Sequence, residues 1–136
     1  MKVLQNVLQR AWILPENSPL RQLPQTNITL LPPVNYLELV EVVKRCRIVL
    51  TDSSGFQEEA PTLGKPVVVM HDVTERLEAV EAGVAVVVGS QANRIVEHVN
   101  LLLDDTTVYE SMARGINPYG DGHAAARIAT ALLERT

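Results

Sequence analysis

Short apolar runs at regular intervals dominate the hydrophobic pattern of the chain. Four runs are rich in β-branched residues, and successive runs begin 18 to 20 residues apart. The last three do not alternate apolar with polar residues, which is typical of strands buried on both faces of a parallel sheet. The predicted strands are residues 28–31, 48–51, 66–70 and 84–88.

Helical spacing of apolar residues fills the intervals between the strands. Gly64 and Gly83 follow two of these segments and are expected to end them, because glycine readily adopts the left-handed conformation at a helix C-terminus. Ser90 is expected to cap a third. The alternation predicts an α/β fold, a Rossmann-like doubly wound parallel sheet with helices on both faces. The predicted helices are residues 36–46, 58–63, 76–82, 95–103, 105–114 and 124–135.

The first 26 residues give a weaker pattern. Pro15, Pro19 and Pro24 interrupt them, and only residues 3–10 weakly favour a helix. We therefore expect an N-terminal segment, 1–26, without an assigned fold, followed by one domain over 27–136.

Composition narrows the function classes. The chain has 136 residues, of which 46% are hydrophobic and 21% charged, as expected for one globular domain with a core. A net charge of −4 and 4% aromatic residues argue against a nucleic-acid-binding surface. The single cysteine, Cys46, excludes an internal disulfide and is expected to be a packed thiol. The chain shows neither a signal peptide nor an apolar run of membrane-spanning length, so we expect a cytoplasmic protein without membrane contact.

The strongest local feature is the segment of residues 50–59, where a predicted strand leads through small residues into a helix. Small residues let backbone N–H groups approach a ligand, and a helix start adds unpaired donors and positive potential. This arrangement predicts a phosphate site at the carboxyl edge of the sheet. Glu59, one turn later, is placed to accept the two hydroxyls of a ribose. The plain alternative is an ordinary strand-to-helix turn with an Asp or Ser cap.

Two further segments carry polar residues in turns. Residues 71–79 follow the next strand, so their loop opens at the same edge; Arg76 there could neutralise a diphosphate or a carboxylate. The alternative is a solvated helix start capped by Asp72 or Thr74. Residues 117–123 form a glycine-rich turn, for which a structural role is favoured over a role in binding. Asp121 in this turn is expected to cap the last helix.

Other catalytic patterns are missing. His71, His98 and His123 lack the spacing of a metal motif, so we expect no metal site. Ser53 and Ser54 lack the flanking glycines of a hydrolase nucleophile elbow.

Three strings together resemble one family. TDSSGFQEEAPTLGKP (residues 51–66), TERLEA (74–79) and NPYGDG (117–122) resemble, in order and spacing, the motifs of the non-hydrolysing UDP-N-acetylglucosamine 2-epimerases. The resemblance covers about residues 27–135, while residues 1–26 show little of it.

The resemblance implies one half, the carboxyl-terminal UDP-binding half, of a two-domain GT-B-type fold. These enzymes interconvert UDP-GlcNAc and UDP-ManNAc by eliminating UDP and adding it back, without a dissociable cofactor or a metal. By motif, Ser53, Ser54 and Gly55 would contact the diphosphate and Glu59 the ribose, and Arg76 would line the pocket. Asp52, Gln57, Glu58 and Glu75 would support them. The implied setting is the supply of sugars for surface polysaccharide.

Two substitutions and one absence depart from the family pattern. Ser54 stands where the family has glycine, which would impair the phosphate fit if that position needs a positive φ. Leu77 replaces a proline suited to the first turn of a helix. The family's amino-terminal domain, with the acidic residues that act on the sugar, is absent from these 136 residues. The resemblance therefore implies a fragment with no catalytic residues of its own, inactive alone and partnered by a missing or separately encoded amino-terminal half.

Three readings remain open at this stage. The chain is the UDP-binding half of a 2-epimerase, half of a hydrolysing 2-epimerase or GT-B glycosyltransferase, or a non-catalytic nucleotide- or partner-binding remnant. A homodimer is expected by analogy with full-length relatives.

Overall fold

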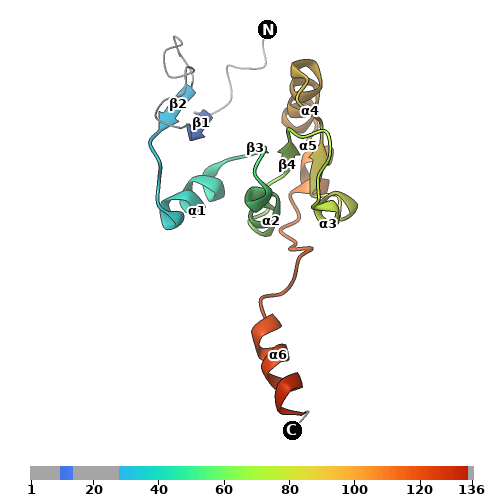
Figure 1. Ribbon diagram of the computed structural model, residues 1–136. Coiled ribbons are helices and arrows are strands. Elements are labelled where there is room, and N and C mark those ends of the chain that lie inside the picture. Colours follow the sequence, from blue (N-terminus) through green and yellow to red (C-terminus); the bar gives the residue numbers. More distant parts are fainter. Residues whose placement is uncertain (1–9, 14–27, 135–136) are drawn as a thin grey trace. The chain divides into compact units, whose positions relative to one another are not determined.

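The computed structural model describes residues 10–13 and 28–134, which fall into two compact units divided between Arg45 and Cys46. Figure 1 shows the elements of both units. Each unit is described by itself below.

The first unit contains a parallel strand pair and one helix. Strand β1 (Arg10–Ile13) pairs with β2 (Ile28–Leu31), with Arg10 opposite Ile28. Helix α1 (Tyr36–Arg45) follows. Its start is a capping box, in which the Asn35 side chain accepts the N–H of Glu38 and the Glu38 carboxylate accepts the N–H of Asn35, both at 3.0 Å.

The sequence pattern predicted β2 and α1 but missed β1. The four residues of β1 are too few to show a period between the prolines that follow and the polar residues that precede them. The helix expected over residues 3–10 lies outside the described residues except for Arg10, which belongs to the strand.

The second unit is a three-stranded parallel sheet with helices on both sides (Figure 1). The strand order is β3–β4–β5, with Val49 opposite Val67 and Val67 opposite Ala85. Helices α2 and α3 pack on the sheet, and α4 packs on β4 and on α5. In chain order the elements are β3 (Val49–Thr51), α2 (Ser54–Thr62), β4 (Val67–Val69), α3 (Leu77–Glu81), β5 (Ala85–Val87), α4 (Ala92–Asp104), α5 (Thr106–Met112) and α6 (Ala124–Leu133).

The central strand β4 is fully buried along its length, as its uninterrupted valines predict. Val68 packs with Val88 and Leu102, and apolar residues of α4 and α5 surround this cluster. Complete burial does not extend to the outer strands: Leu50 of β3 is 41% exposed, and Val86 and Val87 of β5 are only partly buried. That part of the prediction is wrong, because β3 and β5 are edge strands within this sheet.

Glycines end α2 and α3, as predicted. Gly64 and Gly83 have φ values of 68° and 67°. At each end the glycine N–H bonds to a carbonyl three residues earlier, and the next N–H bonds to one five residues earlier. This pair of bonds is the Schellman motif, which satisfies the last carbonyls of a helix.

Two predicted helix starts shift in the structure. Helix α2 begins at Ser54, four residues before the predicted start, so the small-residue turn itself forms its first turn. Helix α4 begins at Ala92 with Gln91 in the N-cap position, so the expected Ser90 cap is wrong: Ser90 lies one residue too early to accept a first-turn N–H.

No described helix is both long and apolar enough to cross a membrane. Cys46 is half-buried, and burial raises the pKa of its thiol despite the opposing charge of Lys65.

Candidate functional site

The turn between β3 and α2 lies at the carboxyl edge of the three-stranded sheet. Thr51 is buried, whereas Ser53, Ser54 and Gly55 are exposed. Ser53 occupies the N-cap position with φ −84° and ψ 130°, but its side chain makes no capping hydrogen bond. The first-turn N–H groups of α2 therefore lack the side-chain acceptor that a capped helix has, and they face an exposed surface at the positive end of the helix dipole. We call residues 52–55 the anion turn.

The backbone of the anion turn accommodates the serine that departs from the family pattern. Ser54 does not have a positive φ and starts the helix in ordinary geometry. Gly55 does not have one either, and a Cβ atom built there would lie 3.8 Å from Ser53 Oγ, an ordinary contact. The backbone conformation thus requires glycine at neither position, and close approach of a ligand is the remaining reason for small residues.

The loop after β4 is joined to the anion turn and to α2. His71 Nε2 lies 2.6 Å from the carbonyl oxygen of Asp52. Thr74 Oγ1 donates to Gln57 Oε1 over 2.6 Å and accepts the N–H of Arg76 over 3.1 Å. Gln57 is 3% exposed, and its buried amide has a partner on each side: Oε1 accepts from Thr74, and Nε2 donates to the carbonyl oxygen of Ser53 over 3.5 Å. Gln57 thus anchors the body of α2 to the loop of residues 71–76.

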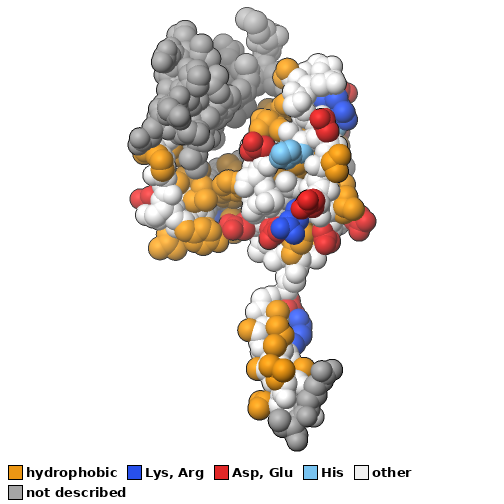
Figure 2. Space-filling model, viewed as in Figure 1, with side chains coloured by type: hydrophobic (Ala, Val, Ile, Leu, Met, Phe, Trp, Pro, Cys, Tyr) orange, Lys and Arg blue, Asp and Glu red, His pale blue; other side chains and the backbone are white. Residues whose placement is uncertain are grey.

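Arg76 also faces α2, through Glu58. Its Nε lies 2.8 Å from Oε1 of Glu58, with both side chains about two-fifths exposed. The N–H is not directed at that oxygen and makes no hydrogen bond within the described part of the chain. The contact is therefore a screened ion pair of small stabilising value, and it partly neutralises the cation predicted to meet a ligand. Figure 2 shows acidic and basic side chains gathered over α2 and α3 on this face.

The other predicted site residues are placed as follows. Glu59 is exposed on α2, and Glu75 is exposed on the loop before α3. Asp52 is exposed and takes part through its backbone carbonyl. Thr74 does not occupy the cap position of α3, which Arg76 holds, and Leu77 is the first residue of that helix, where the family has proline.

The third motif contacts the second through Tyr119. Its hydroxyl donates to the carbonyl oxygen of Arg76 over 3.4 Å, and burial raises the pKa of this phenol. Asn117 Oδ1 accepts the N–H of Tyr119 at 2.9 Å and folds the turn. Gly120 and Gly122 have positive φ values, as predicted for this turn.

Asp121 stands just before α6 rather than at its cap position. Its carboxylate accepts the N–H of His123 over 3.1 Å and pairs with both terminal nitrogens of Arg127. The hydrogen bonds from Arg127, followed by that from His123, lower the pKa of Asp121. The N-cap residue of α6 is His123, so the predicted cap is displaced by two positions.

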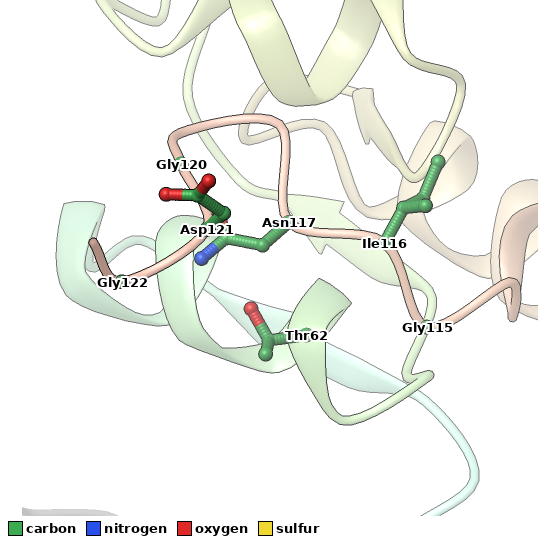
Figure 3. A pocket seen from close by; sticks show the side chains of 7 residues that line it. All are labelled: Thr62, Gly115, Ile116, Asn117, Gly120, Asp121 and Gly122. Atoms are coloured by element: carbon green, nitrogen blue, oxygen red, sulfur yellow. The ribbon is translucent and has the colours of Figure 1, made fainter. Parts of the chain in front are cut away.

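Figure 3 shows a hollow of about 530 Å³ beside the 115–122 segment. It is lined by Thr62, the last residue of α2, and by residues of the 115–122 segment. No residue of the anion turn lines it. Within the described ranges, no group of three His, Cys, Asp or Glu side chains could hold a metal ion.

His71 is the residue that motif reasoning passed over. The sequence offers it only as a metal ligand, and it belongs to no group of three metal-binding side chains among the described residues. Its position gave a usable signal, because it comes just after a buried parallel strand, at the edge where the other loops also open.

The family model for UDP-N-acetylglucosamine 2-epimerase matches residues 5–133. The match includes most of the first 26 residues, where the motifs gave little sign of the family. A probable UDP-N-acetylglucosamine 2-epimerase of Ralstonia solanacearum and the UDP-N-acetylglucosamine 2-epimerase of Escherichia coli K12 are each 53% identical over 106 residues. Those matches cover 78% of this chain and 28% of each relative.

Solved structures show the same relationship. The Neisseria meningitidis UDP-GlcNAc 2-epimerase, bound to UDP-GlcNAc, superimposes with a TM-score of 0.76 at 46% identity, covering 80% of this chain and 29% of that one. A Staphylococcus aureus structure with UDP gives a TM-score of 0.74 at 40% identity over 78% of this chain and 29% of that one. The match thus spans less than a third of the length of these relatives. The fold of the chain is that of the corresponding part of these GT-B enzymes. It belongs to the UDP-N-acetylglucosamine 2-epimerase family.

Proposed function

We propose that the chain binds the UDP part of a UDP-sugar at the anion turn, within the predicted domain of residues 27–136. The observation that carries the proposal is the exposed start of α2, which lacks a side-chain cap and follows small residues at the carboxyl edge of a parallel sheet. The similar Neisseria and Staphylococcus structures, solved with UDP-GlcNAc and UDP, support the choice of nucleotide.

The chemistry of the turn suits a diphosphate. Backbone N–H groups of Ser54 and Gly55 supply donors with fixed directions, and the serine hydroxyls add donors that rotate. Glu59, exposed on the following turn of α2, would accept the two ribose hydroxyls. Arg76 would line the same pocket, and its pairing with Glu58 holds the guanidinium in place while reducing its net charge.

A fixed UDP is what elimination and re-addition require. In the proposed reaction a base outside these 136 residues removes the proton at C2 of the sugar while the diphosphate oxygen leaves C1 with the electron pair of its bond; on re-addition the same oxygen bonds to C1 again and a proton returns to the other face of C2. Donors preorganised around the diphosphate stabilise the charge as it develops. Holding UDP beside the sugar intermediate favours re-addition over escape.

We propose further that these 136 residues bind UDP without epimerising UDP-GlcNAc by themselves. Every site residue named above is proposed to contact the nucleotide, and none is proposed to act at C2 of the sugar, the carbon whose configuration changes. Activity is expected only on mixing with a separately supplied amino-terminal half. The match, which covers only 28% of the length of the Ralstonia relative, supports this division of labour.

Titration calorimetry with UDP tests the binding proposal, with uridine as the ligand that lacks the diphosphate. Heat of binding with UDP and a much weaker signal with uridine is the expected result. Equal, negligible heats would contradict it. A coupled assay with UDP-GlcNAc should show no turnover; UDP-ManNAc as product would overturn the inactivity, and free ManNAc would favour the hydrolysing alternative.

A further inference from the structure

The residues that follow the three strands of the sheet are linked by hydrogen bonds, from the β5 side to β4 and from β4 to β3. Asp52 follows β3, His71 follows β4 and Gly89 follows β5. The N–H of Gly89 donates to the carbonyl oxygen of His71 over 2.9 Å, which fixes the His71 backbone from the β5 side. The His71 side chain reaches the other way, to the carbonyl oxygen of Asp52 at 2.6 Å.

The acceptor determines which imidazole nitrogen carries the proton. A carbonyl oxygen can only accept, so Nε2 of His71 must be the donor. The neutral Nε2–H tautomer and the imidazolium both supply this donor, whereas the neutral Nδ1–H tautomer does not. The contact therefore selects one neutral tautomer and survives protonation of the ring.

This contact closes a clamp on a single peptide group. The peptide between Asp52 and Ser53 has its carbonyl held by His71, and its N–H donates to Thr51 Oγ1 over 2.9 Å. Because a peptide group is planar, fixing both polar ends fixes its orientation. The N–H groups of Ser54 and Gly55 follow directly, so the clamp sets the direction in which the helix start presents its donors.

The clamp acts on a different peptide from the contact that Gln57 makes with the turn, because Gln57 Nε2 donates to the carbonyl oxygen of Ser53 over 3.5 Å, in the peptide that follows the clamped one. The hydrogen bond between Thr74 and Gln57 fixes the body of the helix, and Ala60 and Pro61 on its inner face are buried. His71 is exposed, so its truncation removes little packing. Loss of the imidazole should loosen the turn while leaving the helix folded.

We infer that His71 is a positioning residue, which clamps the Asp52–Ser53 peptide and so holds the anion turn in the geometry that meets a diphosphate. The inference rests on the proposed UDP binding. It assigns His71 no contact with the ligand.

Three variants test the inference in the 136-residue chain, with UDP as the probe in calorimetry. H71A should weaken UDP binding about fivefold, the effect of one lost hydrogen bond. H71Q keeps an amide donor at a similar reach and should restore most of the affinity. H98A is the matched control, because His98 also bonds to a backbone carbonyl, that of Arg94 in its own helix, and it should bind UDP as the unaltered chain does.

Two measurements without UDP complete the test. Nitrogen-15 spectra of the neutral His71 ring should show the Nε2–H tautomer, and amide exchange at Ser53 should be faster in H71A. Unchanged affinity in H71A, no rescue by H71Q, or an Nδ1–H tautomer would each overturn the inference. If the unaltered chain does not bind UDP, the proposed function fails, while the tautomer and exchange results still decide whether the clamp exists.

Discussion

Helices α2 and α5 both start on an extended residue, yet they satisfy their first N–H groups differently. At α5 the Asp105 carboxylate accepts the N–H groups of Thr107 at 2.9 Å and Val108 at 3.1 Å. At α2 the Ser53 hydroxyl accepts none. The start of α5 is stabilised from within the chain, whereas the start of α2 keeps its donors for solvent or a ligand.

A missing side-chain cap is not by itself a sign of function. Helices α3, α4 and α6 also begin without a side-chain capping bond. The start of α2 differs because a parallel strand leads into it through exposed small residues, and because His71 and Thr51 clamp the preceding peptide. The comparison teaches that the surroundings of an open helix start make it a candidate anion site.

The largest expected effect comes from giving α2 the kind of cap that α5 has. In S53D the new carboxylate would accept first-turn N–H groups and repel a diphosphate, so UDP affinity should fall at least about tenfold. The thermal midpoint should not fall, since the cap stabilises the helix. Calorimetry and thermal unfolding measure the two effects.

S53N and S111D are the controls for this variant. The asparagine side chain also accepts the first-turn N–H groups but carries no charge. S53N therefore shows how much of the loss comes from occupying these donors and how much from repulsion of the diphosphate. S111D makes the same charge change on α5 and should leave UDP affinity unaltered. Unchanged binding in S53D would remove the anion turn as the UDP site.

Alanine at Gly55 should distinguish two reasons for a small residue there: close approach of the ligand and the backbone conformation. The backbone accepts a Cβ atom there, so G55A should stabilise the fold by about 0.5–1 kcal/mol through its higher helix propensity. UDP affinity should nevertheless fall about fivefold, the loss of one hydrogen bond, because the methyl group holds the diphosphate away from the N–H. N93A, at an exposed position of α4 away from the anion turn, also raises helix propensity and is the control, which should leave UDP affinity unaltered. Wild-type affinity in G55A would show that no ligand approaches closely at this position.

Removing the α5 cap should have the opposite signature. D105A should lower the free energy of unfolding by about 1 kcal/mol, shifting the thermal midpoint by about 4 °C, without changing UDP affinity. D104A removes the same charge from a neighbouring exposed residue that caps nothing, and its midpoint should change less. A similar loss in both variants would attribute the effect to charge rather than to capping.

The smallest effect is expected at Asp121, which precedes α6 and forms an exposed ion pair with Arg127 of that helix. Because the pKa of Asp121 is lowered in the folded chain, its contribution to stability is present above the ordinary aspartate range and disappears as the pH falls through the lowered pKa. R127Q should raise the carboxyl midpoint, as followed by NMR titration, with little change in thermal midpoint at pH 7. An unchanged midpoint would show that the pairing is not formed in solution.

The sequence predicted most of the fold because its signals are local. The buried valines of β4, the helical spacing of α1 and the glycines that end α2 and α3 each depend on a few neighbouring residues. The four-residue β1 and the exposure of Leu50 were not predictable in this way, since both depend on which strands pair. The start of α2 was predicted too late because small polar residues carry no hydrophobic period.

The sequence by itself determined the family and the order of its motifs, because identity at fixed positions needs no coordinates. It also placed Ser53, Ser54 and Gly55 at a strand-to-helix turn, which the structure has. Only the tertiary structure decided which polar groups find a partner. Arg76 forms an ion pair with Glu58, and the buried Gln57 accepts a hydrogen bond from Thr74. The His71 side chain bonds to the carbonyl oxygen of Asp52, 19 positions away in the sequence. These contacts arise because parallel strands bring distant loops to one edge, and the spacing of residues along a single segment cannot reveal them.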